Sequence, residues 1–173
     1  MRMLFALDRQ DYAGCKQVQR RDSARAIIIR DGRVAMVYSR RYGYYKFPGG
    51  GLEPHESPVE ALQRETLEES GLKIIPASIR EYGFVHRIQK SQTDETVCWV
   101  QDNYYYLCEA EETVQAQQLD EYEAEEGFTP LFADPLTVIR TNRQVKETPY
   151  DPIMFEREAR VLECLRQEGV LPE

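Results

Sequence analysis

Three glutamates stand at helical spacing near the middle of the chain: Glu65, Glu68 and Glu69. Side chains three and four residues apart project from one face of a helix, so we expect the three carboxylates to lie close together. Like charges four residues apart destabilise a helix by roughly 0.2–0.5 kcal/mol. A hard divalent cation, Mg²⁺ or Mn²⁺, removes this repulsion by binding the carboxylate oxygens. The spacing is therefore compatible with a metal site suited to phosphoryl chemistry.

The residues around the glutamates supply other parts that such chemistry needs. Arg64 carries a planar guanidinium that binds carboxylates or phosphates. Three successive glycines at positions 49–51 let the backbone approach a ligand closely, and their carbonyl oxygens can serve a metal. Without this context the three glutamates would more commonly form a solvated helix face, with Arg64 and Glu68 as a surface ion pair. On these residues alone the solvated face stays the commoner alternative, and the spacing of the whole segment decides between the two.

The segment from Gly50 to Leu72 resembles the Nudix box. Thr66 is its one departure, because the pattern has a bulky aliphatic residue there. Seven fixed matches by chance have a frequency of roughly 10⁻⁸ per site, so the resemblance is specific although it covers a short part of the chain. The matching charged and glycine positions are Gly50, Glu56, Arg64, Glu65, Glu68, Glu69 and Gly71.

The resemblance implies a fold and a set of roles. The fold class is α/β, a Nudix-type α/β/α sandwich around a mixed sheet, with the box as a loop–helix–loop motif. Arg64 would orient the acidic cluster, Glu56 would brace the loop through Arg64 or a backbone group, and Gly50 and Gly71 would serve the motif structurally. The metal ligands that it implies for Mg²⁺ or Mn²⁺ are the Gly49 carbonyl, Glu65, Glu68 and Glu69.

The activity that the resemblance implies is hydrolysis of a phosphoric anhydride bond in a nucleoside diphosphate linked to another moiety. Water attacks phosphorus, metal ions stabilise the developing charge, and a carboxylate accepts the proton. Glu65 is the first candidate for this base. Glu126, in an acidic stretch, is the second and could instead complete the metal site, although a solvated loop charge is its commoner role.

Three other functions stay open. The first is an RNA 5′-end pyrophosphohydrolase, which the acidic composition disfavours. The second is a non-hydrolytic nucleotide sensor on the same fold, which the intact glutamates disfavour. The third is an isomerase, for which the chain offers no histidine cluster. The residues that bind substrate cannot be assigned: the tyrosines at 42, 44, 45 and 104–106 are expected to pack, with at most one or two contacting a base.

Composition limits the partners. The 173-residue chain has 30 acidic and 22 basic side chains and a formal net charge of −8, which disfavours binding to long nucleic acids. The four scattered cysteines are expected to be free thiols, and no signal peptide or membrane-length apolar run is present. We therefore expect a cytoplasmic protein with a small nucleotide-type substrate and no membrane partner; the family resemblance also allows a homodimer.

The box helix has clear ends in the sequence. Ser57 suits the N-cap with Glu60 completing a capping box, Pro58 suits the first helical position, and Gly71 suits the C-terminal cap. We predict one domain over residues 1–173. Its parts are an N-terminal extension or strand (1–22), a hairpin turning at 31–32, the box (50–72), strands at 78–87 and 97–108, an acidic loop that can include a strand end (109–126), a helix at 134–142 and a C-terminal helix (151–168).

Overall fold

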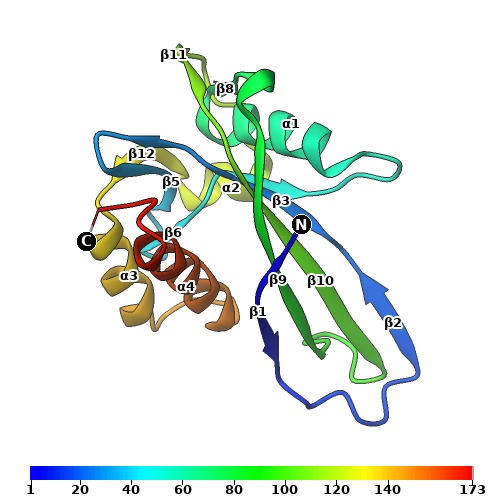
Figure 1. The fold of residues 1–173 in the computed structure, drawn as a ribbon. Coiled ribbons are helices and arrows are strands. Elements are labelled where there is room, and N and C mark those ends of the chain that lie inside the picture. Colours follow the sequence, from blue (N-terminus) through cyan, green and yellow to red (C-terminus); the bar gives the residue numbers. More distant parts are fainter. Residues whose placement is uncertain (173) are drawn as a thin grey trace.

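The computed structural model describes residues 1–172. One mixed sheet has six strands, in the order β1-β9-β10-β3-β7, with β2 beside the first half of β10. β9 and β10 form a long antiparallel pair, and the N-terminal strands β1 and β2 join it in parallel, one on each side (Figure 1). The strands are β1 (Met3–Asp8), β2 (Gln17–Arg20), β3 (Ser23–Ile27), β7 (Gly49–Gly51), β9 (Arg80–Lys90) and β10 (Val97–Leu107).

Two smaller sheets complete the strand layer. Four antiparallel strands centre on β5, and a short pair follows the box helix. The predicted hairpin is confirmed: β4 and β5 pair across the turn at Asp31 and Gly32. The strands of the first sheet are β4 (Ile29–Arg30), β5 (Arg33–Ser39), β6 (Tyr44–Lys46) and β12 (Thr129–Ala133), and those of the second are β8 (Leu72–Ile74) and β11 (Ala110–Val114).

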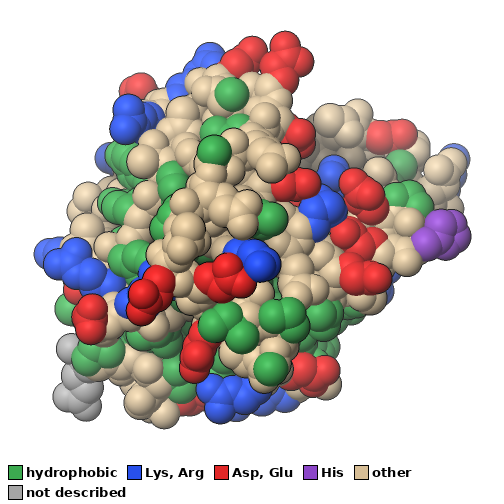
Figure 2. All heavy atoms as spheres, turned by 90° about the horizontal axis from the view of Figure 1, so that it is seen from above, with side chains coloured by type: hydrophobic (Ala, Val, Ile, Leu, Met, Phe, Trp, Pro, Cys, Tyr) green, Lys and Arg blue, Asp and Glu red, His purple; other side chains and the backbone are tan. Residues whose placement is uncertain are grey.

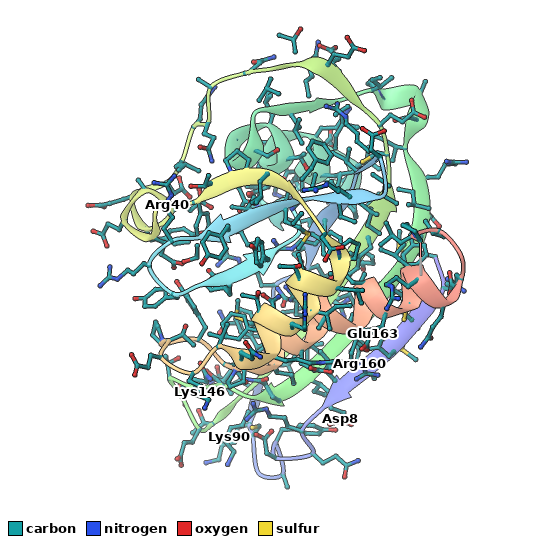
Figure 3. The ribbon with its side chains drawn as sticks, turned by 90° about the vertical axis from the view of Figure 1, so that its left-hand side faces the viewer. Asp8, Arg40, Lys90, Lys146, Arg160 and Glu163 are labelled. Atoms are coloured by element: carbon teal, nitrogen blue, oxygen red, sulfur yellow. The ribbon has the colours of Figure 1, made fainter. Side chains whose placement is uncertain are left out.

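Helices cover both faces of the strand layer. α1 lies on one side, and α3 and α4 lie side by side on the other (Figures 1 and 3). In Figure 3, Arg160 and Glu163 mark α4, while Asp8 and Lys90 mark the ends of β1 and β9 at one end of the sheet. The helices are α1 (Pro58–Ser70), α2 (Glu121–Glu126), α3 (Pro135–Gln144) and α4 (Ile153–Gln167), with a short 3₁₀ turn at Pro76–Ser78. This is the expected α/β/α sandwich around a mixed sheet. None of the helices in residues 1–172 is long and apolar enough to cross a membrane.

Alternation along β3 separates the two halves of the core. Ala24 and Ala26 face α1, where they pack in one buried cluster with Leu62. Ile27 points to the opposite side and packs with Leu162 of α4 in another buried cluster. Successive strand residues point to opposite faces, so Arg25 lies on the α4 side with Ile27. A charged residue is thereby placed on the face that otherwise forms the core under α4.

The box helix ends where the sequence predicts. The Ser57 side chain accepts from the Glu60 amide while the Glu60 side chain accepts from the Ser57 amide, and Pro58 opens α1. Gly71 has φ of 71°, the left-handed conformation that closes a helix with little strain in glycine. The predicted acidic loop is partly wrong, because residues 121–126 form α2, while β11 at 110–114 agrees with the strand end expected in this stretch. An Asp120–Glu123 capping box and a following glycine start and end α2.

Candidate functional site

Arg64 is the centre of the acidic cluster on α1. Its guanidinium binds both oxygens of Glu56 at 2.8 Å, Glu65 at 2.7 Å and Glu68 at 3.3 Å. The hydrogen bonds from Arg64 hold the pKa of Glu56 below its usual value. A further contact of 3.3 Å reaches the Gly51 carbonyl. Arg64 therefore joins the glycine loop, the loop before α1 and two of the three box glutamates. Figure 2 shows acidic side chains around basic ones over this part of the surface.

Glu69 has different partners from Glu65 and Glu68. It follows Leu62 by seven residues and Thr66 by three, so it continues the buried stripe of α1. Its carboxylate pairs with the Lys46 ammonium and accepts from the Gly49 amide at 3.0 Å. Burial raises the pKa of Glu69 to about 7, although the cation of Lys46 acts in the opposite direction. Glu65 and Glu68 therefore share Arg64 as a partner, whereas Glu69 pairs with Lys46.

The glycine loop lies directly against the cluster. Gly49 has φ of 132°, and a Cβ there would run into the Ala24 carbonyl. A Cβ on Gly50 would overlap the Glu65 carboxylate. Only glycines allow this approach of backbone to carboxylate. The Gly49 carbonyl accepts from the Arg25 guanidinium at 2.5 Å, so this expected metal ligand is engaged by a cation of the chain.

The donor set fits a hard divalent cation in its chemistry. Glu65 and Glu68 are carboxylates with side-chain exposures of 17% and 38%, and Glu65 lies in a recess that a Cβ on Gly50 would fill. Within residues 1–172, however, no three His, Cys, Asp or Glu side chains are grouped closely enough to hold a metal ion. Glu69 and the Gly49 carbonyl already have cationic partners, Lys46 and Arg25.

Glu126 lies in a different environment. Its buried carboxylate accepts from the hydroxyl groups of Ser39 at 2.8 Å and Tyr44 at 2.9 Å, and from that of Tyr150. These contacts join the end of α2 to β5, to β6 and to the segment before α4. A solvated loop charge, the commoner role expected for this residue, is therefore excluded. The structure does not bring Glu126 into contact with Glu65, Glu68 or Glu69.

Two cations at the site were missed from the sequence. Lys46 ends β6 and reaches Glu69; Arg25 reaches the glycine loop from β3. The sequence contained a signal for the role of Arg25, because an arginine inside an apolar β-branched run is seldom buried without a partner. The tyrosines pack as expected: Tyr44, Tyr105 and Tyr106 are buried, and the other three are partly buried against the core clusters.

Comparison with known proteins agrees with the fold. A NUDIX hydrolase structure from Nitrosomonas europaea is similar over 83% of this chain and 90% of its own, with a TM-score of 0.56 and 20% sequence identity. Curated relatives match over shorter stretches. The RNA pyrophosphohydrolase of Pectobacterium atrosepticum is 43% identical over 49 residues, which is 27% of this chain and 28% of that protein. The CTP pyrophosphohydrolase of Escherichia coli K12 is 39% identical over 70 residues, which is 38% and 50%.

These matched stretches span between about a quarter and half of the relatives' own lengths. They therefore do not extend over whole proteins. A model of the NUDIX domain, by contrast, matches residues 19–144, well over half of the chain. This range contains the glycine loop, α1 and the Arg64 cluster. The chain therefore belongs to the Nudix family.

Proposed function

We propose that this protein hydrolyses a phosphoric anhydride bond in a nucleoside diphosphate linked to another moiety, with Mg²⁺ or Mn²⁺ as cofactor. The observation that carries the proposal is the Arg64 cluster. It holds Glu65 and Glu68 beside a glycine loop in which any side chain on Gly50 would displace Glu65. We also propose a cytoplasmic location, because the four cysteines are free thiols.

Each residue of the site has a role in this proposal. Glu65 and Glu68 would hold the metal, joined by Glu69 and the Gly49 carbonyl once their internal partners give way. When bound, a divalent cation stabilises negative charge on the phosphoryl oxygens. Glu65 accepts the proton of the attacking water, a contribution of about 10²–10⁴-fold in rate. Arg64 is a positioning residue that fixes the Glu65 carboxylate at 2.7 Å.

Glu126 is the weaker candidate for the proton acceptor. Three hydroxyl groups already donate to its carboxylate, which leaves little capacity to bind an attacking water. We propose that Glu126 positions the segment before α4 instead. Glu126→Gln would then change stability more than it changes kcat, whereas Glu65→Gln would do the reverse.

A second candidate function is removal of pyrophosphate from the 5′ end of RNA. Similarity to proteins named RNA pyrophosphohydrolase favours it. The net charge of −8 opposes it, because contact with several backbone phosphates requires a basic surface. A small nucleotide derivative is therefore the preferred substrate.

The test is a substrate panel incubated with the purified protein and Mg²⁺ or Mn²⁺, with the products separated by chromatography. The panel contains nucleoside triphosphates, dinucleoside polyphosphates, nucleotide sugars and a 5′-triphosphorylated RNA oligonucleotide. We expect metal-dependent cleavage of one class of small nucleotide, reduced at least about 100-fold in Glu65→Gln. Glu112→Gln is the matched control, since Glu112 is an exposed glutamate on β11. Binding without turnover across the panel would instead indicate a sensor.

A further inference from the structure

A polar cavity of about 400 Å³ lies beside the box, between the outer half of the β9–β10 pair and the start of α4. Its walls include residues of the β9–β10 turn and of the segment that leads into α4 (Figure 1). Lys90 marks the nearby end of β9, and Lys146 marks the chain between α3 and α4 (Figure 3). The volume is within the range of small-molecule sites in proteins.

The cavity is cationic although the protein is acidic. Three arginines, Arg25, Arg87 and Arg157, line it together with a single carboxylate, that of Asp151. Arg157 is paired with Glu158, and Arg87 contacts Asp151 at 3.3 Å. Arginines gathered around an open cavity provide a binding site for a multiply charged anion such as a polyphosphate.

The hydrogen bonds of Arg25 suit an arginine that binds an anion. Its NH1 donates only to backbone carbonyls, at 3.2 Å to Phe47 and 2.5 Å to Gly49. Its Nε is buried and has no hydrogen-bond partner within residues 1–172. Leaving a buried donor unsatisfied is costly, so such groups commonly mark a site for a ligand. Through Gly49, Arg25 also connects the cavity to the box.

Trp99 provides a flat apolar surface at the far end. It lines the cavity, and within residues 1–172 it pairs with no other aromatic ring. The sheet register places Gln19 and Gln89 on either side of Trp99. Gln101 follows Trp99 by two residues, so it lies on the same face, opposite Arg87. An open indole flanked by amides that both donate and accept can stack and hydrogen-bond a nucleobase.

The first cavity adjoins a second one through shared wall residues. A second cavity of about 170 Å³ shares Arg25 and Arg157 with the first and extends to Lys46, the partner of Glu69. Tyr105 of β10 lies opposite Arg25, and Trp99 precedes it by six residues, so about 20 Å separates them along the strand. A pyrophosphate alone is much shorter than this backbone separation, so a molecule that contacts both residues must carry a further group such as a nucleoside.

We propose that this cavity binds the nucleoside part of the substrate. The base stacks on Trp99 and hydrogen-bonds to Gln19 and Gln101, while the phosphate chain passes Arg87 and Arg25 toward the glycine loop. The substrate class is a nucleoside polyphosphate or a diphosphate derivative of similar length. This assignment rests on the proposed hydrolase function for the role of the bound molecule, but the binding itself can be measured without turnover.

The test uses the tryptophan fluorescence of the intact protein, because Trp99 is the only tryptophan in the chain. The protein is titrated with a nucleoside triphosphate and with inorganic triphosphate, both with a chelator so that no hydrolysis intervenes. We expect the nucleotide to quench the fluorescence and inorganic triphosphate to compete without quenching it. Arg25→Gln should weaken nucleotide binding at least about tenfold, since one lost charge-assisted contact corresponds to that factor.

Substitutions at Trp99 are followed by calorimetry, because they remove the fluorescent group. Trp99→Ala should weaken nucleotide binding by about 5- to 150-fold, the range for loss of one stacked base, and Trp99→Phe should restore most of it. Tyr104→Leu, on the opposite face of the same strand, is the control and should change affinity little. A circular dichroism spectrum and a thermal melt establish that each variant is folded.

The possible results separate the two proposals. Hydrolysis with no quenching, and with unchanged KM in Trp99→Ala, would overturn the cavity assignment and leave the hydrolase standing. Nucleotide-specific quenching with no hydrolysis of any substrate would support the cavity and remove the proposed function. Equal affinity for inorganic triphosphate and the nucleotide would overturn the base contact. Tighter binding of a 5′-triphosphorylated oligonucleotide than of the mononucleotide would overturn the choice of a small substrate.

Discussion

Replacement of Lys46 by methionine would remove the cationic partner of a buried carboxylate. The side chains of Lys46 and Glu69 are 13% and 1% exposed, so water cannot replace the ammonium. Removing one partner of a buried pair costs about 3–5 kcal/mol, and the Gly49 amide, which still donates to Glu69, favours the lower end. Loss of the ammonium over the Phe128 ring, 4.5 Å from its centroid, adds about 0.5–1 kcal/mol. The expected loss is therefore about 3–4 kcal/mol in the free energy of unfolding well above pH 7, where the Glu69 carboxyl is ionised, and it is smaller below pH 7 because the carboxyl is then neutral.

Urea unfolding followed by circular dichroism measures this loss as a lower midpoint with an unchanged m-value. For a chain of this size the corresponding fall in Tm is about 6–16 °C. Adding Glu69→Gln to the Lys46→Met background should recover at least about 1 kcal/mol, because no unpaired charge then remains. A loss below about 1 kcal/mol in the single variant, or a double variant no more stable than the single one, would refute the reasoning.

The Lys46→Met variant also tests whether Mg²⁺ binds Glu69. If Mg²⁺ binds Glu69, the cation should take over the role of the missing ammonium in Lys46→Met. Mg²⁺ should then raise the Tm of this variant by more than it raises that of the parent protein, since a ligand of the folded state stabilises it by mass action. Equal shifts would indicate that Glu69 keeps a structural role.

Three further expectations follow from single contacts. Gly50→Ala should lower kcat about 100-fold through displacement of Glu65, with little change in Tm; unchanged kcat would contradict the role of the loop. Asp134→Ala should lose about 1 kcal/mol of unfolding free energy at neutral pH, since Asp134 caps α3. Hydrogen bonds hold the pKa of Asp134 below its usual value. The stabilisation by Asp134 is therefore complete above its unfolded-state pKa and disappears as pH falls through its folded-state pKa. Unfolding experiments at neutral and at acidic pH should show a smaller difference between the variant and the parent protein at acidic pH. Burial raises the pKa of Cys108 to about 12, so mass spectrometry should show alkylation of Cys15 long before Cys108.

Local sequence rules were sufficient for the elements that carry the motif. The capping box at Ser57 and the glycine at position 71 determine both ends of α1 through contacts within a few residues. The same rules, applied to Asp120 and Glu123, would have revealed α2. Its acidic composition instead favoured a loop, because charge density is a weaker guide than the position of a cap.

The candidate site depends on contacts that the sequence does not display. Helical spacing predicts that Glu65, Glu68 and Glu69 lie together. Glu69, however, lies on the buried edge of α1, and its carboxylate pairs with Lys46 of β6. The stripe through Leu62 contained that information, but the identity of the partner is a property of the tertiary fold. The cavity near Trp99 likewise arises from strands that are distant in the chain and meet only in the sheet.

The placement of the N-terminal strands has a consequence during synthesis. β1 pairs with β9, and β2 pairs with β10, so neither has its partner until the ribosome has added residues up to about 100. At about 5–20 residues per second this is a wait of roughly 4–20 s for strands that are made first. Non-local pairing of this kind slows folding, and an unpaired strand is open to association with other chains. The four residues of β2 are all exposed and include Arg20, and such charge protects an edge during this interval.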